Sequence, residues 1–268
     1  MSKSLIPAQR RERILEYLAI HRIARSTDLS RLLDASEATV RRDLLWLEEE
    51  GFIQRTHGGA ILKQQLDFEA EYQHRAQIFS EEKRIIGELA ASLVDEGDTI
   101  FINSGTTTTQ IIKHLRNYSD ITVITNNLVA VLEVGDVNYE LILLGGAFQP
   151  KSNSVAGRFA LGNISQVHAN KAFIGVDGIN LKYGFTVPSI AEAELVRMMI
   201  ERAHGDIIIV ADHSKWGRIS NYEIARIGQI QKLITDSRLD SAAQASLQSR
   251  GIDILYADEI LKERIVEL

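Results

Sequence analysis

The stretch "SEATVRRDLLWLEEEGFIQRTHGGA", residues 36–60, predicts a helix followed by a two-stranded hairpin. Val40, Leu44 and Leu47 recur at the spacing of one helix face, so we expect them to be buried. Gly51 suits the end of the helix, where a left-handed residue is needed. Beyond it, "FIQRT" and "AIL" are strand-like segments on either side of the turn "HGG". The stretch therefore predicts a helix with a short β-wing behind it.

The preceding residues predict two further helices of the same small domain. "AQRRERILEYLAIH", residues 8–21, places Ile14 and Leu18 on one helix face. "STDLSRLL", residues 26–33, predicts a short second helix with Ser26 as its N-terminal cap. The break "DAS" then leads into the third helix. Three helices and a wing in this order predict a winged helix-turn-helix domain.

Three side chains of the third helix, Thr39, Arg41 and Arg42, lie outside its apolar face near the N-terminal end, which enters the major groove in helix-turn-helix proteins. Arg55 and His57 of the hairpin are placed to reach the DNA backbone or the adjacent minor groove. An exposed arginine pair also occurs on helical modules that bind protein, so the pair alone leaves that alternative open. The complete order of helices, arginines and hairpin favours DNA.

Charge is divided unevenly along the 268 residues. Residues 1–63 contain 11 Lys and Arg against 9 Asp and Glu, a net charge of +2, whereas the rest contains 19 against 27, a net charge of −8. This confines the expected DNA contact to the N-terminal part. Residues 64–80 are mostly polar and lack clear periodicity. We therefore expect a DNA-binding domain over 1–63, a linker over 64–80 and a second domain over 81–268, whose first helix Ser80 is expected to cap.

The composition excludes several kinds of site. There is no cysteine, which excludes disulfides, thiolate zinc sites and a cysteine nucleophile. The seven histidines have no metal-site spacing, the N-terminus has no apolar signal segment, and no apolar run is long enough to span a membrane. We expect a cytoplasmic protein without metal, cofactor or membrane partner.

Seven apolar, strand-length runs alternate with helical patterns in the second domain: "TIFIN", "ITVIT", "ELILL", "KAFIG", "DIIIVA", "KLIT" and "DILY". Runs that are apolar throughout suit strands buried on both faces, so the alternation predicts an α/β fold with a mainly parallel sheet. Ligands in such folds bind at the carboxyl ends of the strands. Polar and glycine-rich segments follow five of these strands: "SGTTT", "TNN", "GG", "GVDG" and "DHSK".

The segment "SGTTT", residues 104–108, opens a helix after the first of these strands. Its hydroxyls and the free N–H groups of the helix N-terminus can hold an oxyanion. Serine and threonine after a strand also act as ordinary helix caps, but five polar strand ends together favour a phosphorylated sugar or polyol. The segment lacks the three spaced glycines of a dinucleotide site and the P-loop pattern, which argues against NAD and nucleoside triphosphates.

The motifs resemble those of the DeoR family of bacterial transcriptional regulators. In the first domain the likeness rests on "ATVRRDL", "LE" before "GFIQR", and "HGGA". In the second it rests on "SGTTT", "TNN", "LGG", "GVDGI", "GFT", "AEAE" and "ADHSKWG", in this order. The resemblance implies a sensor domain similar to sugar-phosphate isomerases of the ribose-5-phosphate type. It also implies base contacts from Ser36, Thr39, Arg41 and Arg42.

The same resemblance implies an effector site. The residues that would hold phosphate are Ser104, Gly105, Thr106 and Thr107. Those that would face the sugar or balance charge are Asn126, Asp177, Glu192 and Lys215. Asn103 stands where the family usually has aspartate, and an amide donates as well as accepts, whereas a carboxylate only accepts. This difference alters the expected contact of Asn103 with the polyol part of the effector and not the phosphate contacts.

Two functions fit these expectations. The favoured one is a repressor of a carbohydrate-metabolism operon, a dimer or tetramer whose operator affinity is controlled by a phosphorylated sugar. The alternative is a sugar-phosphate isomerase in which Asp177 or Glu192 is the general base and Lys215 stabilises an enediolate. An isomerase gains nothing evident from a DNA-reading domain, so we expect a regulator and not an enzyme.

Overall fold

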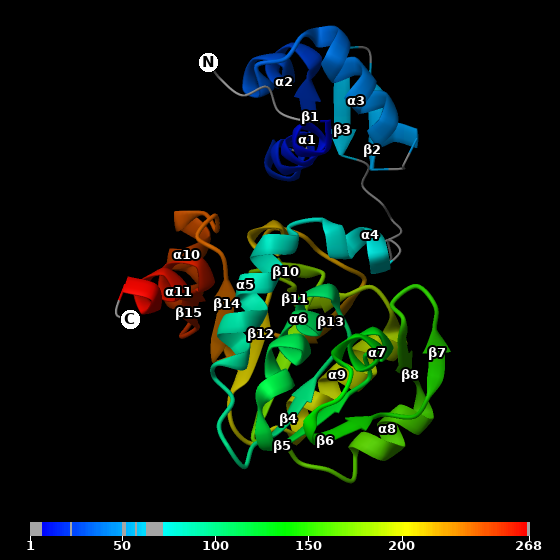
Figure 1. Cartoon of the computed structure of the whole chain (residues 1–268), viewed down its shortest axis with the longest axis vertical. Helices are drawn as coiled ribbons and strands as arrows, with labels where there is room; N and C mark the ends of the chain where they lie inside the picture. The colour runs from blue at the N-terminus through cyan, green and yellow to red at the C-terminus, as the bar shows by residue number, and fades with distance from the viewer. Residues whose placement is uncertain (1–6, 22, 50–51, 57, 63–71, 267–268) are drawn as a thin grey trace. The chain divides into compact units, whose positions relative to one another are not determined.

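The computed structural model describes residues 7–21, 23–49, 52–56, 58–62 and 72–266, which are drawn as ribbon in Figure 1. The chain forms two compact units, Met1–Asp67 and Phe68–Leu268. The boundary between them falls inside the stretch 64–80 that the sequence predicts as linker. None of the helices in the described part of the chain combines the length and apolar content needed to cross a membrane.

The first unit has three helices and a small antiparallel sheet. The helices are α1 (Pro7–His21), α2 (Ser26–Leu33) and α3 (Glu37–Glu49). The sheet has the order β1 (Ile23–Arg25), β3 (Gly59–Leu62) and β2 (Ile53–Thr56). This is the winged helix-turn-helix that the sequence predicts. The strand β1 was not predicted, because three residues are too few to show a periodicity.

The core of the first unit consists of the side chains that the helical spacing predicts. Ile14 and Leu18 of α1 and Val40, Leu44 and Leu47 of α3 are all at most 1% exposed. Burial of five large aliphatic side chains at about 1.5–3 kcal/mol each is the main stabilisation of so small a unit. The three helices therefore pack around one shared cluster.

The expected role of Ser26 as a helix cap is wrong. Ser26 is the first residue of α2, and Arg25 occupies the cap position without a side-chain hydrogen bond. The Ser26 backbone N–H is instead satisfied by the carbonyl of Gly58, at 2.8 Å. The wing therefore supplies the acceptor that a capping side chain would otherwise provide.

Glycine is required at two positions of the wing for different physical reasons. Gly58 has φ +114°, a conformation that other residues rarely adopt. A Cβ on Gly59 would lie 2.0 Å from the carbonyl oxygen of Ala24, so only glycine lets β3 pair so closely with β1. Gly58 thus fixes the bend, and Gly59 lets the third strand join the sheet.

The second unit is built on a seven-stranded sheet in which every neighbouring pair is parallel. This confirms the α/β prediction, and the seven strands are the seven apolar runs of the sequence. In spatial order they are β15 (Asp253–Tyr256), β14 (Lys232–Thr235), β12 (Ile207–Val210), β9 (Lys171–Gly175), β4 (Thr99–Ile102), β5 (Ser119–Thr125) and β6 (Asn138–Leu143).

Helices cover both faces of this sheet. One face carries α5 (Ser80–Ala91), α6 (Thr106–His114), α7 (Leu128–Val134) and α11 (Ala257–Val266). The other carries α8 (Arg158–Ile164), α9 (Ile190–Arg202) and α10 (Ser241–Gln248). Alternate side chains of β4 point to opposite faces, so Ile100 and Ile102 join the first core and Phe101 the second. Figure 1 shows α5 and α6 across the near face.

Several short elements complete the second unit and were not predicted. A hairpin joins β7 (Ala147–Gln149) to β8 (Ser154–Ala156), and a second antiparallel sheet has the order β10 (Gly178–Asn180), β11 (Gly184–Val187) and β13 (Tyr222–Ala225). The 3₁₀ turns are η1 (Leu115–Asn117), η2 (His213–Lys215) and η3 (Ile227–Gln229). The helix α4 (Tyr72–Gln77) lies within the predicted linker.

The expectation that Ser80 caps the first helix of the second domain is also wrong. Ser80 is the first residue of α5, and the cap position belongs to Phe79, whose φ of +52° is left-handed. Phe79 is buried and its ring meets the His213 ring edge-on, with the centroids 4.9 Å apart. Packing of this ring therefore stabilises a backbone conformation that costs free energy by itself.

Candidate functional site

The N-terminal end of α3 is exposed in the way that DNA contact requires. Ser36 caps the helix, since its Oγ accepts the Thr39 N–H at 3.2 Å. The two hydroxyls are 2.9 Å apart. Arg41 and Arg42 are exposed, and Arg41 forms an ion pair with Glu37 at 3.4 Å. Such an exposed pair is weak and leaves the guanidinium free to exchange Glu37 for DNA.

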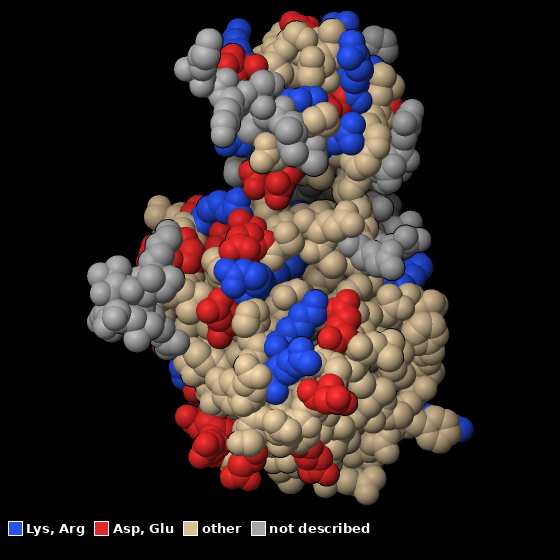
Figure 2. Space-filling view, viewed as in Figure 1, with Lys and Arg blue, Asp and Glu red and all other residues tan. Residues whose placement is uncertain are grey.

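The wing residue Arg55 is held against α3. Its backbone N–H donates to Glu48 Oε1 at 2.9 Å, and its guanidinium lies 3.9 Å from the same carboxylate. Lys and Arg side chains run down one side of the first unit in Figure 2. His57, the other wing residue expected to approach DNA, lies outside the described residues.

A buried carboxylate that the sequence did not single out fixes the orientation of α3. Asp43 is 2% exposed and accepts from Arg10 at 2.8 Å and from Arg11 at 3.2 Å. The guanidinium of Arg11 also lies 4.1 Å from the ring centre of Trp46. Because both arginines belong to α1, these contacts tie α1 to the helix expected to enter the groove.

In the second unit, the loop after β4 leads directly into α6. Gly105 precedes the helix, and its carbonyl accepts hydrogen bonds from Thr108 Oγ1 at 3.1 Å and Thr109 Oγ1 at 2.8 Å. Those two hydroxyls are thus tied to the backbone of the helix itself. Within the described part of the chain, the hydroxyls of Thr106 and Thr107 have no such partner. They and the free N–H groups of the first turn are donors available to an anion.

Two buried asparagines hold this loop in place. Asn103 is fully buried: its Nδ2 donates to the Gly175 carbonyl at 3.0 Å, and its Oδ1 accepts the Gly175 N–H at 2.7 Å. Asn126 is 1% exposed; its Oδ1 accepts the Ser104 N–H at 2.8 Å, and its Nδ2 donates to the Val155 carbonyl at 2.9 Å. Both side chains, expected at the effector, are occupied by backbone groups.

The loop after β9 brings one carboxylate close to two cationic side chains. Asp177 Oδ1 lies 3.4 Å from Arg75 Nη1 of α4. It also interacts electrostatically with Lys215, in η2 at the end of β12. Burial lowers the pKa of Lys215, and the charges of Asp177 and Asp212 oppose this shift. Because β9 lies between β4 and β12 in the sheet, these charges share one edge with the loop before α6.

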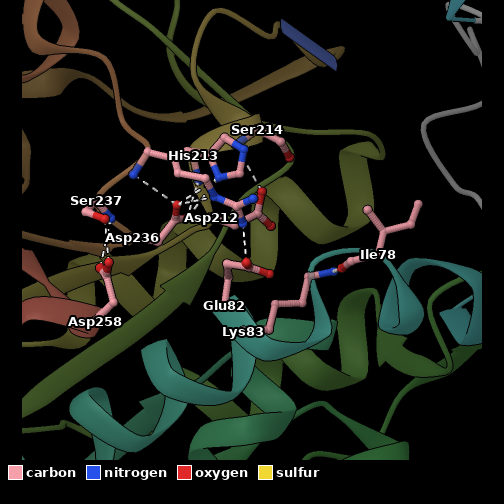
Figure 3. Close-up of polar contacts among 10 residues, drawn as sticks. Ile78, Glu82, Lys83, Asp212, His213, Ser214, Asp236, Ser237 and Asp258 are labelled. Atoms are coloured by element: carbon pink, nitrogen blue, oxygen red, sulfur yellow. Dashed lines mark hydrogen bonds and ion pairs between the residues drawn. The ribbon is translucent and has the colours of Figure 1, made fainter. Parts of the chain in front are cut away.

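A second buried charge cluster surrounds Asp212, as Figure 3 shows. Asp212 is 2% exposed, and its Oδ1 accepts the Ser214 N–H at 3.0 Å. Burial alone would raise its pKa, but the charges of Lys215 and Lys83 outweigh burial and hold the pKa at about 2. The other oxygen, Oδ2, is buried without a hydrogen-bond partner among the described residues. An ionised oxygen of this kind is available to a hydroxyl of a ligand.

Neighbouring contacts fix the position of this cluster. The His213 ring and Asp236 are hydrogen-bonded at 3.0 Å, and both side chains are buried. Glu82 of α5 is paired with Arg238, whose guanidinium lies 5.3 Å from the Phe79 ring centre. The start of α5 is thereby attached to the ends of β12 and β14.

The remaining predicted residue, Glu192, lies in the first turn of α9 and is half-buried. Its backbone N–H is capped by Ser189 Oγ at 3.2 Å. The structure thus brings Asn103, Ser104 and Asn126 together at one loop, and Asp177 and Lys215 at the next strands.

Sequence reasoning missed two cations, Arg75 in the predicted linker and Lys83 in the first helix of the second domain. Lys83 is 4% exposed and burial lowers its pKa to about 8. One signal was available: Lys83, Ile86 and Ala90 have the spacing of one helix face, and a lysine in an apolar stripe is unusual. Asp212 also belongs to the site, although the sequence prediction did not include it.

Comparison with known proteins gives two matching family models that cover the two units. The DeoR-like helix-turn-helix domain matches residues 10–65, and the DeoR C terminal sensor domain matches residues 78–237. Among solved structures, ribose 5-phosphate isomerase A from Methanocaldococcus jannaschii is similar, with 17% identity, a TM-score of 0.38, and coverage of 51% of this chain and 54% of that chain.

Curated relatives are similar over nearly their whole length. The HTH-type transcriptional repressor GlcR of Bacillus subtilis is 38% identical, with 92% of this chain and 95% of that protein covered. The HTH-type transcriptional regulator GolR of Listeria innocua is 32% identical, with 95% and 100% covered. Both are named as regulators and not as enzymes. The chain therefore belongs to the DeoR family and is a DNA-binding transcriptional regulator, not an enzyme.

Proposed function

We propose that the chain is a repressor of a carbohydrate-metabolism operon, released from its operator by a phosphorylated sugar or polyol. The single observation that carries the proposal is the start of α6, where Thr106 and Thr107 present unpaired hydroxyls at the carboxyl edge of the sheet. Lys215 lies at the same edge, two strands away. Helix N–H groups, hydroxyls and an ammonium group together suit a phosphate dianion.

The remaining residues of the edge suit the polyol part of the effector. Asp177 and the unpartnered Oδ2 of Asp212 are acceptors for sugar hydroxyls. In this proposal Asn103 and Asn126 act indirectly, by holding the loops in place. Glu192 remains assigned to the sugar end by the family resemblance.

We assign residues 1–63 to operator binding and residues 81–268 to effector sensing. Base contacts come from α3, and backbone contacts come from the wing. The residues proposed to contact bases are Ser36, Thr39, Arg41 and Arg42. Arg55 and His57 are proposed to reach the backbone or the minor groove. The protein is expected to be a dimer or tetramer, so we propose that two DNA-binding units contact the operator together. Helix-turn-helix dimers bind half-sites about 34 Å apart.

We place self-association next to β6, the edge strand of the large sheet. Large apolar side chains are exposed on elements around this edge, with Leu132 83%, Phe148 56% and Phe159 64% exposed. An unpaired strand edge beside exposed apolar side chains is a typical site for a second copy. Sedimentation of the Leu132→Ser and Phe159→Ser double variant should show smaller assemblies than the unaltered chain.

The test is a DNA titration at constant ionic strength with a fragment that the chain selects from a random library. It is repeated against phosphorylated pentoses, hexoses and polyols, with each unphosphorylated compound as the control. One phosphorylated compound should weaken DNA binding by about five- to 150-fold, which is the usual range of allosteric coupling. The proposal fails if no phosphorylated compound acts differently from its unphosphorylated counterpart.

A further inference from the structure

We propose that Arg75 contacts the phosphate group of the effector directly. This contact links the effector site to α4, the first helix after the DNA-binding unit. This inference rests on the proposed function above. It concerns a residue that lies outside every motif quoted from the sequence.

The helix α4 is attached to both sides of the effector site. Tyr72 and Arg75 are three residues apart, so they lie on one face of α4. The Tyr72 hydroxyl is hydrogen-bonded to Thr109 Oγ1 in the first turn of α6, and burial raises the pKa of Tyr72 to about 12, so it stays protonated. Arg75 reaches Asp177, which follows β9. The α4 face therefore bridges the ends of β4 and β9.

The C-terminal end of α4 is held by a buried cation. Lys83 Nζ donates to the Arg75 carbonyl at 2.5 Å and to the Ile78 carbonyl. An ammonium group at the carbonyl end of a helix is favourable because it satisfies acceptors that the helix leaves open. Lys83 also interacts with Asp212. A change at Arg75 is therefore transmitted to the whole of this short helix.

Arg75 has hydrogen-bonding capacity that its present contacts do not use. Its distance of 3.4 Å to Asp177 is long for a charge-assisted hydrogen bond, which is usually about 2.7–2.9 Å. Its Nε is buried and has no partner among the described residues. A guanidinium carries five N–H donors in a planar fork, which matches two phosphate oxygens. An incoming phosphate would satisfy donors that Asp177 leaves open.

Several cations lie near Arg75. Arg75, Lys83, Lys215 and Arg218 act on each other or on the carboxylates Asp177 and Asp212. Two further carboxylates near Asp212, Asp236 and Glu82, are paired with His213 and Arg238. A bound dianion would give the cations around Arg75 a further partner in a partly buried place.

One side of α4 is not closely packed. A pocket of about 490 Å³ lies beside the helix, lined by Tyr72, Ala76 and Gln77 on one side and by Val129 and Glu133 of α7 on the other. The helix can therefore shift without opening a packed core. When phosphate replaces Asp177 as the partner of Arg75, α4 moves with it. The segment that joins the two units immediately precedes α4 in the sequence. A movement of α4 is therefore passed on to the DNA-binding unit.

The experiment measures the binding of inorganic phosphate to the full-length chain by calorimetry. The Arg75→Gln variant should bind phosphate about tenfold more weakly or worse, the usual loss for a hydrogen bond to a charged group. Arg84→Gln is the matched control, because Arg84 is an exposed arginine of α5 that pairs with Glu81 and Glu88. It should bind phosphate like the unaltered chain.

A second variant separates phosphate contact from structural support. Asp177→Asn removes the carboxylate that competes for Arg75, so phosphate should bind more tightly than to the unaltered chain. Support of the fold alone would predict no gain. If Arg75→Gln does not fold, judged by thermal unfolding, Arg75→Lys keeps the charge without the fork and should bind phosphate with intermediate affinity. Hydrogen exchange over residues 72–77 should slow when phosphate is added.

The outcomes distinguish this inference from the proposed function. If Thr106→Val weakens phosphate binding while the Arg75 variants bind like the unaltered chain, the inference is wrong and the proposed function stands. If the unaltered chain binds neither inorganic phosphate nor any phosphorylated sugar, the proposed function is wrong and the inference falls with it. Unchanged affinity in Asp177→Asn contradicts the exchange of partners.

Discussion

Asn103 and Gly175 are joined by two hydrogen bonds, one in each direction, of 3.0 and 2.7 Å. They connect the ends of β4 and β9 directly beneath the loop that leads into α6. The donor half of this pair requires an amide, because an ionised carboxylate only accepts. The Asn103 amide is therefore matched to a backbone carbonyl of this chain.

The Asn103→Asp substitution should lower the free energy of unfolding by about 1–3 kcal/mol, because the Gly175 carbonyl loses its donor in a buried place. The loss should shrink at acid pH, where a protonated carboxyl group donates again. Urea unfolding over a range of pH measures both effects. Asn180→Asp is the control, since Asn180 Oδ1 only accepts, from the N–H of Lys182 at 2.9 Å. Equal losses in the two variants would contradict the donor argument.

The hydroxyls of Thr106 and Thr109 in α6 should have different roles, one in effector binding and the other in stability. Thr106→Val should abolish the response to effector and change stability by less than about 0.5 kcal/mol, because no described group depends on that hydroxyl. Thr109→Val should instead cost about 1–3 kcal/mol, since its hydroxyl contacts the Gly105 carbonyl, Asn127 and Tyr72. Thermal unfolding and the DNA titration with effector give both values. A full effector response in Thr106→Val would remove this hydroxyl from the site.

Arg42→Ala should weaken specific DNA binding by about 1–3 kcal/mol if the arginine reads a base. Competition against unrelated DNA at fixed salt separates this loss from a general loss of charge. Arg116→Ala is the matched control, because Arg116 is an exposed arginine of the second unit. Equal affinity of the Arg42 variant and the unaltered chain would show that α3 is placed differently on DNA.

Anion binding should weaken as the pH rises through about 8. Burial lowers the pKa of Lys83 from its ordinary value to about 8, so Lys83 is charged below that pH and neutral above it. Sulfate is the suitable probe, since its charge is constant over this range. The decline should disappear in Lys83→Met. If it persists there, the role given to Lys83 is wrong.

Much of the fold follows from local patterns. The seven parallel strands are apolar throughout because helices cover both faces, and that property is visible in a single run. The pairing of β11 with β13 was not predicted, because the paired residues lie 35–40 positions apart in the sequence. Ser26 and Ser80 were assigned as caps because the sequence does not reveal whether a serine precedes a helix or begins it.

The site was predicted only in part, because a residue type does not reveal its partner. An asparagine after a strand suits a sugar hydroxyl as well as a backbone N–H, and Asn126 is bound to the backbone. Arg75 was missed because the helix that carries it has only six residues, and Lys83 because its burial depends on residues distant in the sequence. Their place beside Asp177 and Asp212 depends on contacts across about 100 residues of chain.

The contacts of Asp43 with Arg10 and Arg11 also affect how the DNA affinity of the first unit, here called the head, should depend on salt concentration. The head contains 11 lysines and arginines, but two of them are committed to this buried carboxylate and stay there when DNA arrives. Only side chains that reach phosphate displace condensed counterions from the duplex. The dependence of operator affinity on ionic strength should therefore be shallower than the basic composition of the head suggests.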